Sequence, residues 1–322
     1  MRSLETALHG AGPSGTIGPM AVRIGGIRGA RAIECLQGLS VGDALGDQWF
    51  REATGHDLGA VHRVVPPGPW HWTDDTNMAL SVVEVLLQHG KVDQEALAIS
   101  FANRYDYGRG YGPSMHRVLR RVADGDHWAV VTKEQFGGQG SYGNGAAMRV
   151  APLGAWFADD LCLVVEEAAK SAQVTHGNRE AEAGAVAVAV ATALAWQGRD
   201  EPPAPPRSFL ESVRSLVPDS EVADRLGRAA RLGEKSSVPL AVSALGNGTD
   251  LSAQDTVPFA LWSAATHLDS FEETFWSTVS GLGDRDTTCA IACGVVAGRS
   301  GVAGIPSDWL ARRESLPTWA CP

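Results

Sequence analysis

Two short segments combine threonine hydroxyls with neighbouring aspartate carboxylates. The first is Trp72-Thr-Asp-Asp-Thr76 and the second is Gly283-Asp-Arg-Asp-Thr-Thr288. Each stands directly before a run of apolar or small residues that predicts a helix, so helix N-capping alone is the simplest interpretation. Together, however, the two segments supply hard oxygen ligands of the kind that Mg²⁺, Mn²⁺ or Ca²⁺ prefer, whereas zinc is disfavoured.

The like charge of these segments leads to the same expectation. If the two helix starts converge, Asp74, Asp75, Asp284 and Asp286 bring together more negative charge than a dry site tolerates. Bound cations are the simplest way to neutralise that charge. The pattern therefore predicts one or two metal ions.

A glycine-rich segment runs from Phe136 to Arg149, with the sequence FGGQGSYGNGAAMR. Its glycines let the backbone approach a ligand closely and offer N–H groups to a phosphate, while Phe136 and Tyr142 offer flat faces for a base or a ribose. A flexible surface loop is the alternative interpretation. Two weaker signals accompany this segment. Arg109-Gly-Tyr-Gly-Pro113 precedes a predicted helix whose N-terminus can receive an anion, and His176 is either a ligand contact or a satisfied core residue.

Helical periodicity dominates the segments that must position these residues. Strand signals are scarce: Ala185–Ala191 alternates Ala and Val, but its long Ala-rich surroundings favour a helix. The predicted helices are Ala30–Gly42, Thr76–His89, Asp93–Arg104, Ser114–Ala123, Asp160–Gln173, Arg179–Trp196, Phe209–Leu216, Ser220–Leu232, Val257–Leu268, Phe271–Gly281 and Thr287–Ala297. We predict an all-α fold with one domain over residues 23–322, preceded by a flexible N-terminal tail over residues 1–22.

The composition excludes several classes of function. With 27 Lys and Arg against 37 Asp and Glu, the 322-residue chain has a net charge of −10 and no basic track for nucleic acid. Five scattered cysteines make neither a disulfide framework nor a zinc motif, which favours a reducing cytoplasm. The longest apolar run, Ala183–Trp196, is shorter than the roughly 20 residues of a membrane span. We expect a cytoplasmic, monomeric protein with no membrane partner.

Five short motifs, taken in their order along the chain, resemble those of a known protein family. They are Gly42-Asp-Ala-Leu-Gly46, Trp72-Thr-Asp-Asp-Thr76, Gly143-Asn-Gly-Ala-Ala-Met-Arg149, Thr175-His176 and Asp284-Arg-Asp-Thr-Thr288. Together they resemble the ADP-ribosylglycohydrolase family, which includes the dinitrogenase-reductase-activating glycohydrolase and the ADP-ribosyl-acceptor hydrolases. The glycine-rich segment and the RGYG loop look most similar to the subgroup that acts on ADP-ribosylated serine, poly(ADP-ribose) and O-acetyl-ADP-ribose. The resemblance implies a compact orthogonal helical bundle with a binuclear magnesium or manganese centre at the bottom of a cleft.

The resemblance also implies roles for individual residues. The metal positions it matches are Thr73, Asp74, Asp75, Asp284, Asp286 and Thr287. The expected substrate-binding residues are Gly110, Gly112, Phe136, Gly138, Gly140, Ser141, Tyr142, Gly143, Asn144, Met148 and His176, with Phe136 near the adenine and His176 near the diphosphate. Asp43 either orients the site from behind these residues or has a buried structural role at a helix end.

One position departs from the subgroup. A Glu that contributes to metal binding and catalysis stands four positions after the last Gly of the GDALG-type motif, and here that position is Phe50. Asp47 and Glu52 lie close by in the sequence. A carboxylate must orient or deprotonate the attacking water, and Asp75 and Glu52 are the two candidates.

The implied reaction is hydrolysis of the bond at C1 of the distal ribose, which releases ADP-ribose from a protein Ser, another O-linked target, poly(ADP-ribose) or O-acetyl-ADP-ribose. Three alternatives stay open. They are an arginine-directed ADP-ribosyl hydrolase, a non-catalytic crystallin-like ADP-ribose-binding member, which Phe50 keeps in play, and a diphosphate lyase on a helical scaffold. The TDDT spacing and the glycine-rich segment argue against the lyase. The expected partner is an ADP-ribosylated protein or an ADP-ribose derivative, with nucleic acid expected only as a modified substrate.

Overall fold

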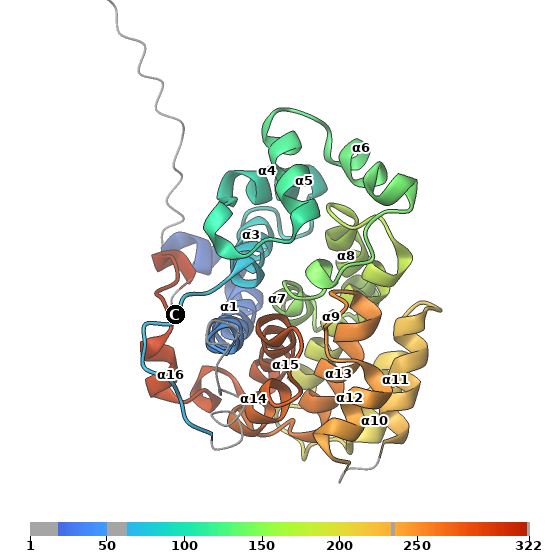
Figure 1. The fold of residues 1–322 in the computed structure, drawn as a ribbon. Coiled ribbons are helices and arrows are strands. Elements are labelled where there is room, and N and C mark those ends of the chain that lie inside the picture. Colours follow the sequence, from blue (N-terminus) through green and yellow to red (C-terminus); the bar gives the residue numbers. More distant parts are fainter. Residues whose placement is uncertain (1–18, 50–62, 233–235, 321–322) are drawn as a thin grey trace, which may run out of the picture.

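The computed structural model describes residues 19–49, 63–232 and 236–320, with only the backbone for residues 19–24. This part of the chain contains fifteen α-helices and no β-strand, and its two isolated bridges join Trp70 to Arg313 and Gly143 to Ser252 (Figure 1). The helices are α1 (Pro19–Asp47), α3 (Asp74–His89), α4 (Gln94–Arg104), α5 (Pro113–Ala123), α6 (Trp128–Lys133), α7 (Ala151–Trp156), α8 (Leu161–Gln173), α9 (Arg179–Gln197), α10 (Pro206–Arg214), α11 (Glu221–Arg231), α12 (Val238–Leu245), α13 (Ala253–Thr266), α14 (Phe271–Val279), α15 (Arg285–Ser300) and α16 (Ser307–Arg312). The predicted all-α fold is confirmed.

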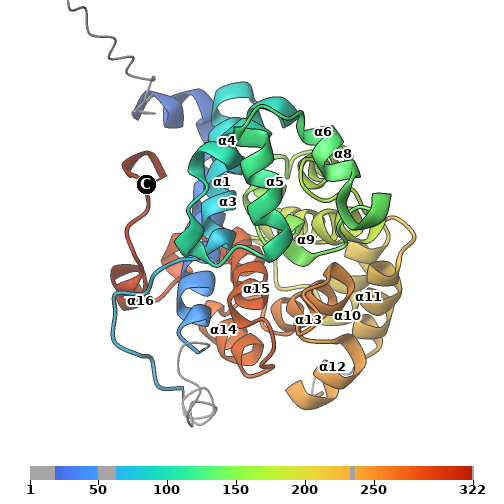
Figure 2. The same ribbon diagram turned by 45° about the horizontal axis from the view of Figure 1, so that its top comes forward.

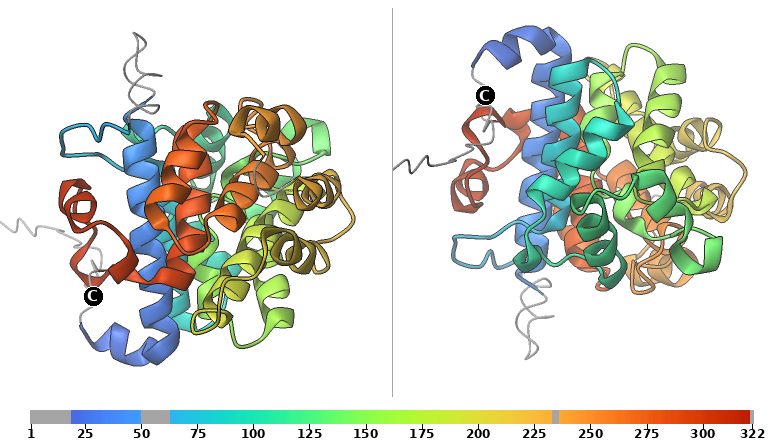
Figure 3. Two further views of the ribbon diagram at one scale, coloured as in Figure 1. Left: turned by 90° about the horizontal axis from the view of Figure 1, so that it is seen from below. Right: turned by 90° about the horizontal axis from the view of Figure 1, so that it is seen from above.

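The centre of the molecule is the pair α1 and α15, which lie side by side (Figures 1 and 3). Three glycines of α1, spaced four apart, face α15. A Cβ atom on Gly38 would lie 2.3 Å from Ala297 Cβ, one on Gly42 would lie 2.4 Å from the Cys289 carbonyl oxygen, and one on Gly46 would lie 2.6 Å from that of Arg285. Any side chain there would push the helices apart, so this glycine stripe (Gly38, Gly42, Gly46) lets the two backbones touch.

The other elements surround this pair. Helices α3 and α7 pack against α1, while α9, α13 and α14 pack against α15. Helix α4 packs against α3 and α5 packs against α4, on one side of the pair (Figure 2). Helix α9 is buried on nearly every face through its Ala and Val residues, which explains why its sequence has no polar stripe. No helix in the described ranges has the length and apolar character of a membrane span.

Capping residues account for several helix ends. Thr73 caps α3 by accepting a hydrogen bond from the Asp75 N–H, and Gly90 ends that helix in the left-handed conformation with φ of 70°. Asp93 and Asp160 were predicted as first helical residues, but they are the N-caps of α4 and α8. These predicted starts were therefore one residue early.

Three differences from the sequence-based prediction have local causes. The short helices α6, α7 and α12 were not predicted, because six to eight residues carry too little periodicity. Helix α10 begins earlier than predicted, at Pro206, because proline is well suited to a first helical turn. The predicted tail boundary at residue 22 falls inside α1, which begins at Pro19, and residues 1–18 lie outside the described part.

Candidate metal centre and substrate pocket

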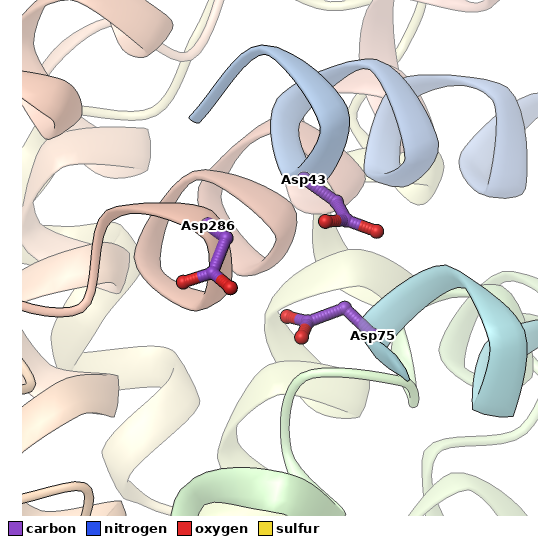
Figure 4. A group of neighbouring side chains, drawn as sticks. All are labelled: Asp43, Asp75 and Asp286. Atoms are coloured by element: carbon purple, nitrogen blue, oxygen red, sulfur yellow. The ribbon is translucent and has the colours of Figure 1, made fainter. Parts of the chain in front are cut away.

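Three helix ends bring carboxylates together. Asp43 lies near the C-terminal end of α1, Asp75 in the first turn of α3 and Asp286 in the first turn of α15. One carboxylate oxygen from each lies within 4.8 Å of the others, and the three side chains point toward a common centre (Figure 4). The predicted convergence of the two Thr/Asp segments is therefore observed, with Asp43 as an additional member.

Asp43 anchors the start of α3. Its two oxygens accept hydrogen bonds from the Thr73 N–H at 3.0 Å, the Thr73 hydroxyl at 2.8 Å, the Thr76 N–H at 3.1 Å and the Thr76 hydroxyl at 2.5 Å. Burial raises the pKa of Asp43 to about 6, and these hydrogen bonds oppose that rise. Asp43 therefore satisfies orphan N–H groups of α3 and fixes the direction of the neighbouring Asp75.

Asp75 and Asp286 each have an unpaired oxygen. Asp75 Oδ1 and Asp286 Oδ1 are buried and have no hydrogen-bond partner within the described structure. The pKa of both carboxyls is raised well above its ordinary value, first by burial and then by the charges of the other carboxylates. An orphaned buried carboxylate oxygen is costly. A divalent cation would pair both oxygens and offset the like charge, so the residues present fit a hard metal ion.

Asp74 and Asp284 complete the acidic group. Burial and the charge of Asp43 raise the pKa of Asp74 to about 8. Burial also raises the pKa of Asp284, although hydrogen bonds from Asn144 and Thr287 oppose the shift. Asp284 is the N-cap residue of α15, and its own N–H donates to the Asn247 carbonyl at 3.2 Å.

A pocket of about 460 Å³ opens above this acidic group. Most of the predicted site residues line it, namely Asp74, Asp75, Gly110, Gly112, Phe136, Ser141, Tyr142, Gly143, Asn144, Met148, His176, Asp284, Asp286 and Thr287. At its edge Phe136 and Tyr142 are about half exposed, with ring centroids 6.1 Å apart and planes at 34°. Two half-exposed flat faces are suited to a planar ring such as a nucleobase.

Three predicted site residues do not line the pocket, and a fourth falls outside the described residues. Thr73 does not line the pocket, because its hydroxyl is directed to Asp43. Gly138 does not line it either, and Gly140 packs against the backbone of Gly177, where a Cβ would lie 2.5 Å from the carbonyl carbon. Glu52 lies outside the described residues, as does Phe50.

The pocket also includes residues that were not predicted as site residues. They are Met78, Pro113, Ser114, Met115, Gly145, Asp250 and Leu251. Met78 follows Asp74 by one helical turn, which is a usable signal. Leu251 had no such signal, because it belongs to a loop that is distant in the sequence. The Leu251 carbonyl accepts a hydrogen bond from the Asn144 N–H at 3.1 Å, and this contact holds the loop at the pocket.

The loop before α3 is held from the side by Arg109. Its guanidinium lies 3.5 Å from the ring centroid of Trp72, donates to the Trp72 carbonyl at 2.8 Å and pairs with both oxygens of Glu314 at 2.7 and 2.8 Å. Arg109 thereby connects the loop carrying Gly110 to the segment that leads into Thr73.

Fold and pocket together define an all-helical protein with a pocket over a cluster of carboxylates that could hold a cation. The model of the family ADP-ribosylglycohydrolase matches residues 26–320. The chain belongs to the ADP-ribosylglycohydrolase family, and this membership supports an ADP-ribosyl hydrolase activity. Membership in this family also excludes the alternative of a diphosphate lyase, which the Asp clusters had suggested.

Similar proteins cover most of the chain. An uncharacterised protein of Archaeoglobus fulgidus is 35% identical over 86% of this chain and 89% of its own length. ADP-ribosylhydrolase ARH3 of Bos taurus is 30% identical over 90% of this chain and 91% of its own length. ADP-ribosylarginine hydrolase Tri1 of Pseudomonas putida is 27% identical over 87% of this chain and 73% of its own length. A solved structure titled ADP-ribosylglycohydrolase-related protein complex matches with a TM-score of 0.65 and 30% identity, over 89% of this chain and 93% of that one.

Proposed function

We propose that this protein is a hydrolase, dependent on Mg²⁺ or Mn²⁺, that cleaves the bond at C1 of the distal ribose of ADP-ribose. The proposed acceptors are O-linked: protein serine, poly(ADP-ribose) or an acetyl group. The observation that carries the metal dependence is the pair of buried, unpaired oxygens on Asp75 and Asp286. Family membership supports the choice of ADP-ribose.

The proposed metal ligands are the carboxylates of Asp74, Asp75, Asp284 and Asp286 together with the hydroxyls of Thr73 and Thr287. We propose two ions. When bound, they supply a positive template that fixes the ribose hydroxyls and lowers the pKa of a nearby water. The engagement of Thr73 with Asp43 makes Thr73 the weakest member of this set.

The protein itself positions the substrate. The half-exposed rings of Phe136 and Tyr142 are the proposed contacts of the adenine, and the backbone around Gly143 is the proposed contact of the diphosphate. Holding the glycosidic bond in one orientation supplies much of the reduction in barrier height. Positive charge develops at the anomeric carbon in the transition state, and the carboxylates beneath the pocket stabilise it.

The attacking water requires a carboxylate to orient it. Asp75 is one candidate because it lines the pocket and has an unpaired oxygen. Glu52 is the other candidate on sequence grounds. A variant of each residue separates the two assignments, since loss of the orienting group lowers kcat more than it raises KM.

The O-linked class of acceptor rests on the resemblance of the glycine-rich segment and the RGYG loop to the serine-directed subgroup. The relatives named ADP-ribosylhydrolase ARH3 reach 30% identity, against 27% for the arginine-directed relative. The arginine-directed activity is the second candidate because that relative also matches over 87% of this chain.

A substrate panel tests the proposal. Purified protein is incubated with ADP-ribosylated serine peptide, ADP-ribosylated arginine peptide, poly(ADP-ribose) and O-acetyl-ADP-ribose, with Mg²⁺ or with a chelator, and free ADP-ribose is measured. We expect Mg²⁺-dependent release from the O-linked substrates and a loss of at least about 100-fold in Asp284→Asn, which removes a charged ligand. Asp124→Asn at the exposed C-cap of α5 is the matched control.

Three results would overturn parts of the proposal. Equal turnover with Mg²⁺ and with the chelator would rule out the proposed metal dependence. Turnover of the arginine peptide alone would reassign the acceptor. Binding of ADP-ribose without turnover of any substrate would favour the non-catalytic alternative.

A further inference from the structure

A chain of three side chains leads from the core to the pocket. The Arg149 guanidinium Nη2 lies 2.9 Å from the Thr175 hydroxyl, and the same hydroxyl lies 2.7 Å from Nδ1 of His176. All three residues are buried, but His176 also lines the pocket.

Counting donors and acceptors along these three side chains determines which nitrogen of the His176 imidazole carries the proton. A guanidinium has only donors, so the Thr175 oxygen must accept from Arg149. The hydroxyl has one hydrogen to give, and His176 Nδ1 is its only other partner among the described residues. If Nδ1 carried a proton, the hydroxyl would receive two donors and its own buried hydrogen would have no acceptor. Nδ1 is therefore the acceptor, and the ring proton lies on Nε2.

The opposite nitrogen lies beside two glycines that line the pocket. His176 Nε2 makes no hydrogen bond within the described part of the chain and lies beside Gly143 and Gly145. A Cβ on either glycine would approach this nitrogen, to 3.3 Å from Gly143 and to 3.1 Å from Gly145. Burial, and secondarily the charge of Arg149, lowers the pKa of His176 to about 3, so the ring carries a single proton at neutral pH.

Other contacts hold Arg149 and Thr175 in place. Arg149 lies with its guanidinium carbon 4.4 Å from the ring centroid of Phe101 and donates to the Ser171 carbonyl at 2.8 Å. The backbone before His176 is fixed by Gln135, whose amide donates to the Thr175 carbonyl at 2.8 Å. Thr175 therefore has little freedom to turn its hydroxyl elsewhere.

We propose that Arg149 and Thr175 are positioning residues that fix His176 as the neutral Nε2–H tautomer, so that His176 donates a hydrogen bond to an anionic oxygen of the ligand. This deepens, and rests on, the proposed function, in which that ligand is an ADP-ribose derivative. His176 then acts as a donor and not as a general base, because its lone pair at Nδ1 faces Thr175.

The wild-type protein tests the tautomer without any substitution. Nitrogen-15 NMR of histidine-labelled protein distinguishes a protonated from a bare ring nitrogen, and among the 9 histidines the His176 signals are those that disappear in His176→Asn. We expect protonated Nε2 and bare Nδ1 at neutral pH in metal-free protein. A charged ring or an Nδ1–H tautomer would overturn the proposal.

A pair of variants tests the role of the hydroxyl. Thr175→Val keeps the shape of the side chain but removes the hydroxyl, whereas Thr175→Ser keeps it. We expect mixed tautomers and an approximately tenfold higher Kd for ADP-ribose in Thr175→Val, as for one lost hydrogen bond to a charged group. Thr175→Ser should restore both properties, with circular dichroism confirming that each variant is folded.

The possible results separate this inference from the function on which it rests. An unchanged tautomer and unchanged Kd in folded Thr175→Val would refute the positioning role. The expected tautomer in wild type, without any binding of ADP-ribose in calorimetry, would refute the proposed function and the identity of the ligand while supporting the tautomer assignment. If Thr175→Val does not fold, the wild-type spectrum still decides the tautomer.

Discussion

The side-chain amide of Asn144 donates a hydrogen bond to Oδ2 of Asp284 over 2.6 Å. The same nitrogen lies 3.0 Å from the Thr256 hydroxyl. Asn144 belongs to the glycine-rich segment and Asp284 is the N-cap residue of α15, so this contact joins the proposed ligand-binding loop to the group of buried aspartates. The sequence predicted Asn144 as a substrate contact. Asn144 does line the pocket, and its side chain also holds a carboxylate in place.

Replacement of Asn144 by Ala should weaken metal binding without unfolding the protein. Loss of a hydrogen bond that orients a metal-binding carboxylate typically lowers affinity about 10–100-fold. Calorimetric titration with Mn²⁺ measures this change. Gln197→Ala is the matched control, since its amide donates to the Ala158 carbonyl far from the pocket. Equal Mn²⁺ affinity in wild type and Asn144→Ala would show that Asp284 needs no such support.

Replacement of Asp286 by Asn should have opposite effects on stability with and without metal. In the metal-free protein it removes one of several buried like charges, so the variant should melt at a higher temperature than wild type, with each kcal/mol worth about 2–4 °C. Saturating Mn²⁺ should raise the melting temperature of wild type but not that of the variant. Differential scanning fluorimetry checks both arms, with Asp124→Asn as control. A lower melting temperature of the metal-free variant would contradict the repulsion.

The contact between α1 and α15 makes Gly42→Ala a severe change. The added methyl group would overlap the Cys289 carbonyl, which is backbone and cannot turn away. Overpacking of this kind costs about 1–3 kcal/mol, and separation of the helices should also lower turnover because Asp43 and Asp286 move apart. Urea unfolding and the ADP-ribose release assay measure the two effects. Gly198→Ala is the control, because the nearest atoms there are 3.4 Å away.

The depressed pKa of His176 gives stability a dependence on pH. Its folded pKa of about 3 lies below the ordinary value of 6.5, so between these values the unfolded chain binds more protons. The free energy of unfolding should therefore fall as the pH drops below about 6.5, by up to about 1.4 kcal/mol per pH unit from this residue. His176→Asn should show a correspondingly shallower loss in urea unfolding between about pH 5 and 7. Parallel curves for the two proteins would mean that His176 titrates normally.

Local signals explain what the sequence predicted of the fold. The start of α3 was recognisable because Thr73 is a capping residue before an apolar run, and α9 was recognisable by its length. Short helices escaped because their stability comes from packing and not from periodicity. Proline and cap residues shifted the predicted ends by one to three residues, as the bounds of α8 and α10 show.

The residues of the site could be predicted from the sequence, but the tertiary contacts that hold them together could not. Asp74, Asp75, Asp284 and Asp286 stood out because each pair lies in a short motif. Asp43 accepts hydrogen bonds from four donor groups at the start of α3, which lie thirty or more residues away in the sequence, and no spacing rule encodes these contacts. The loop carrying Leu251 likewise reaches the pocket only through tertiary contacts.

The glycine stripe of α1 should affect how quickly the proposed metal site binds an ion. Main-chain contact sets the separation of α1 and α15, and no deformable layer of side chains lies between them at Gly38, Gly42 and Gly46. Asp43 and Asp286 are attached to these two helices, so their spacing is already set before an ion arrives. Capture of the ion should then be limited by the release of its own water shell, and the scattering profile of the protein should be the same before and after loading.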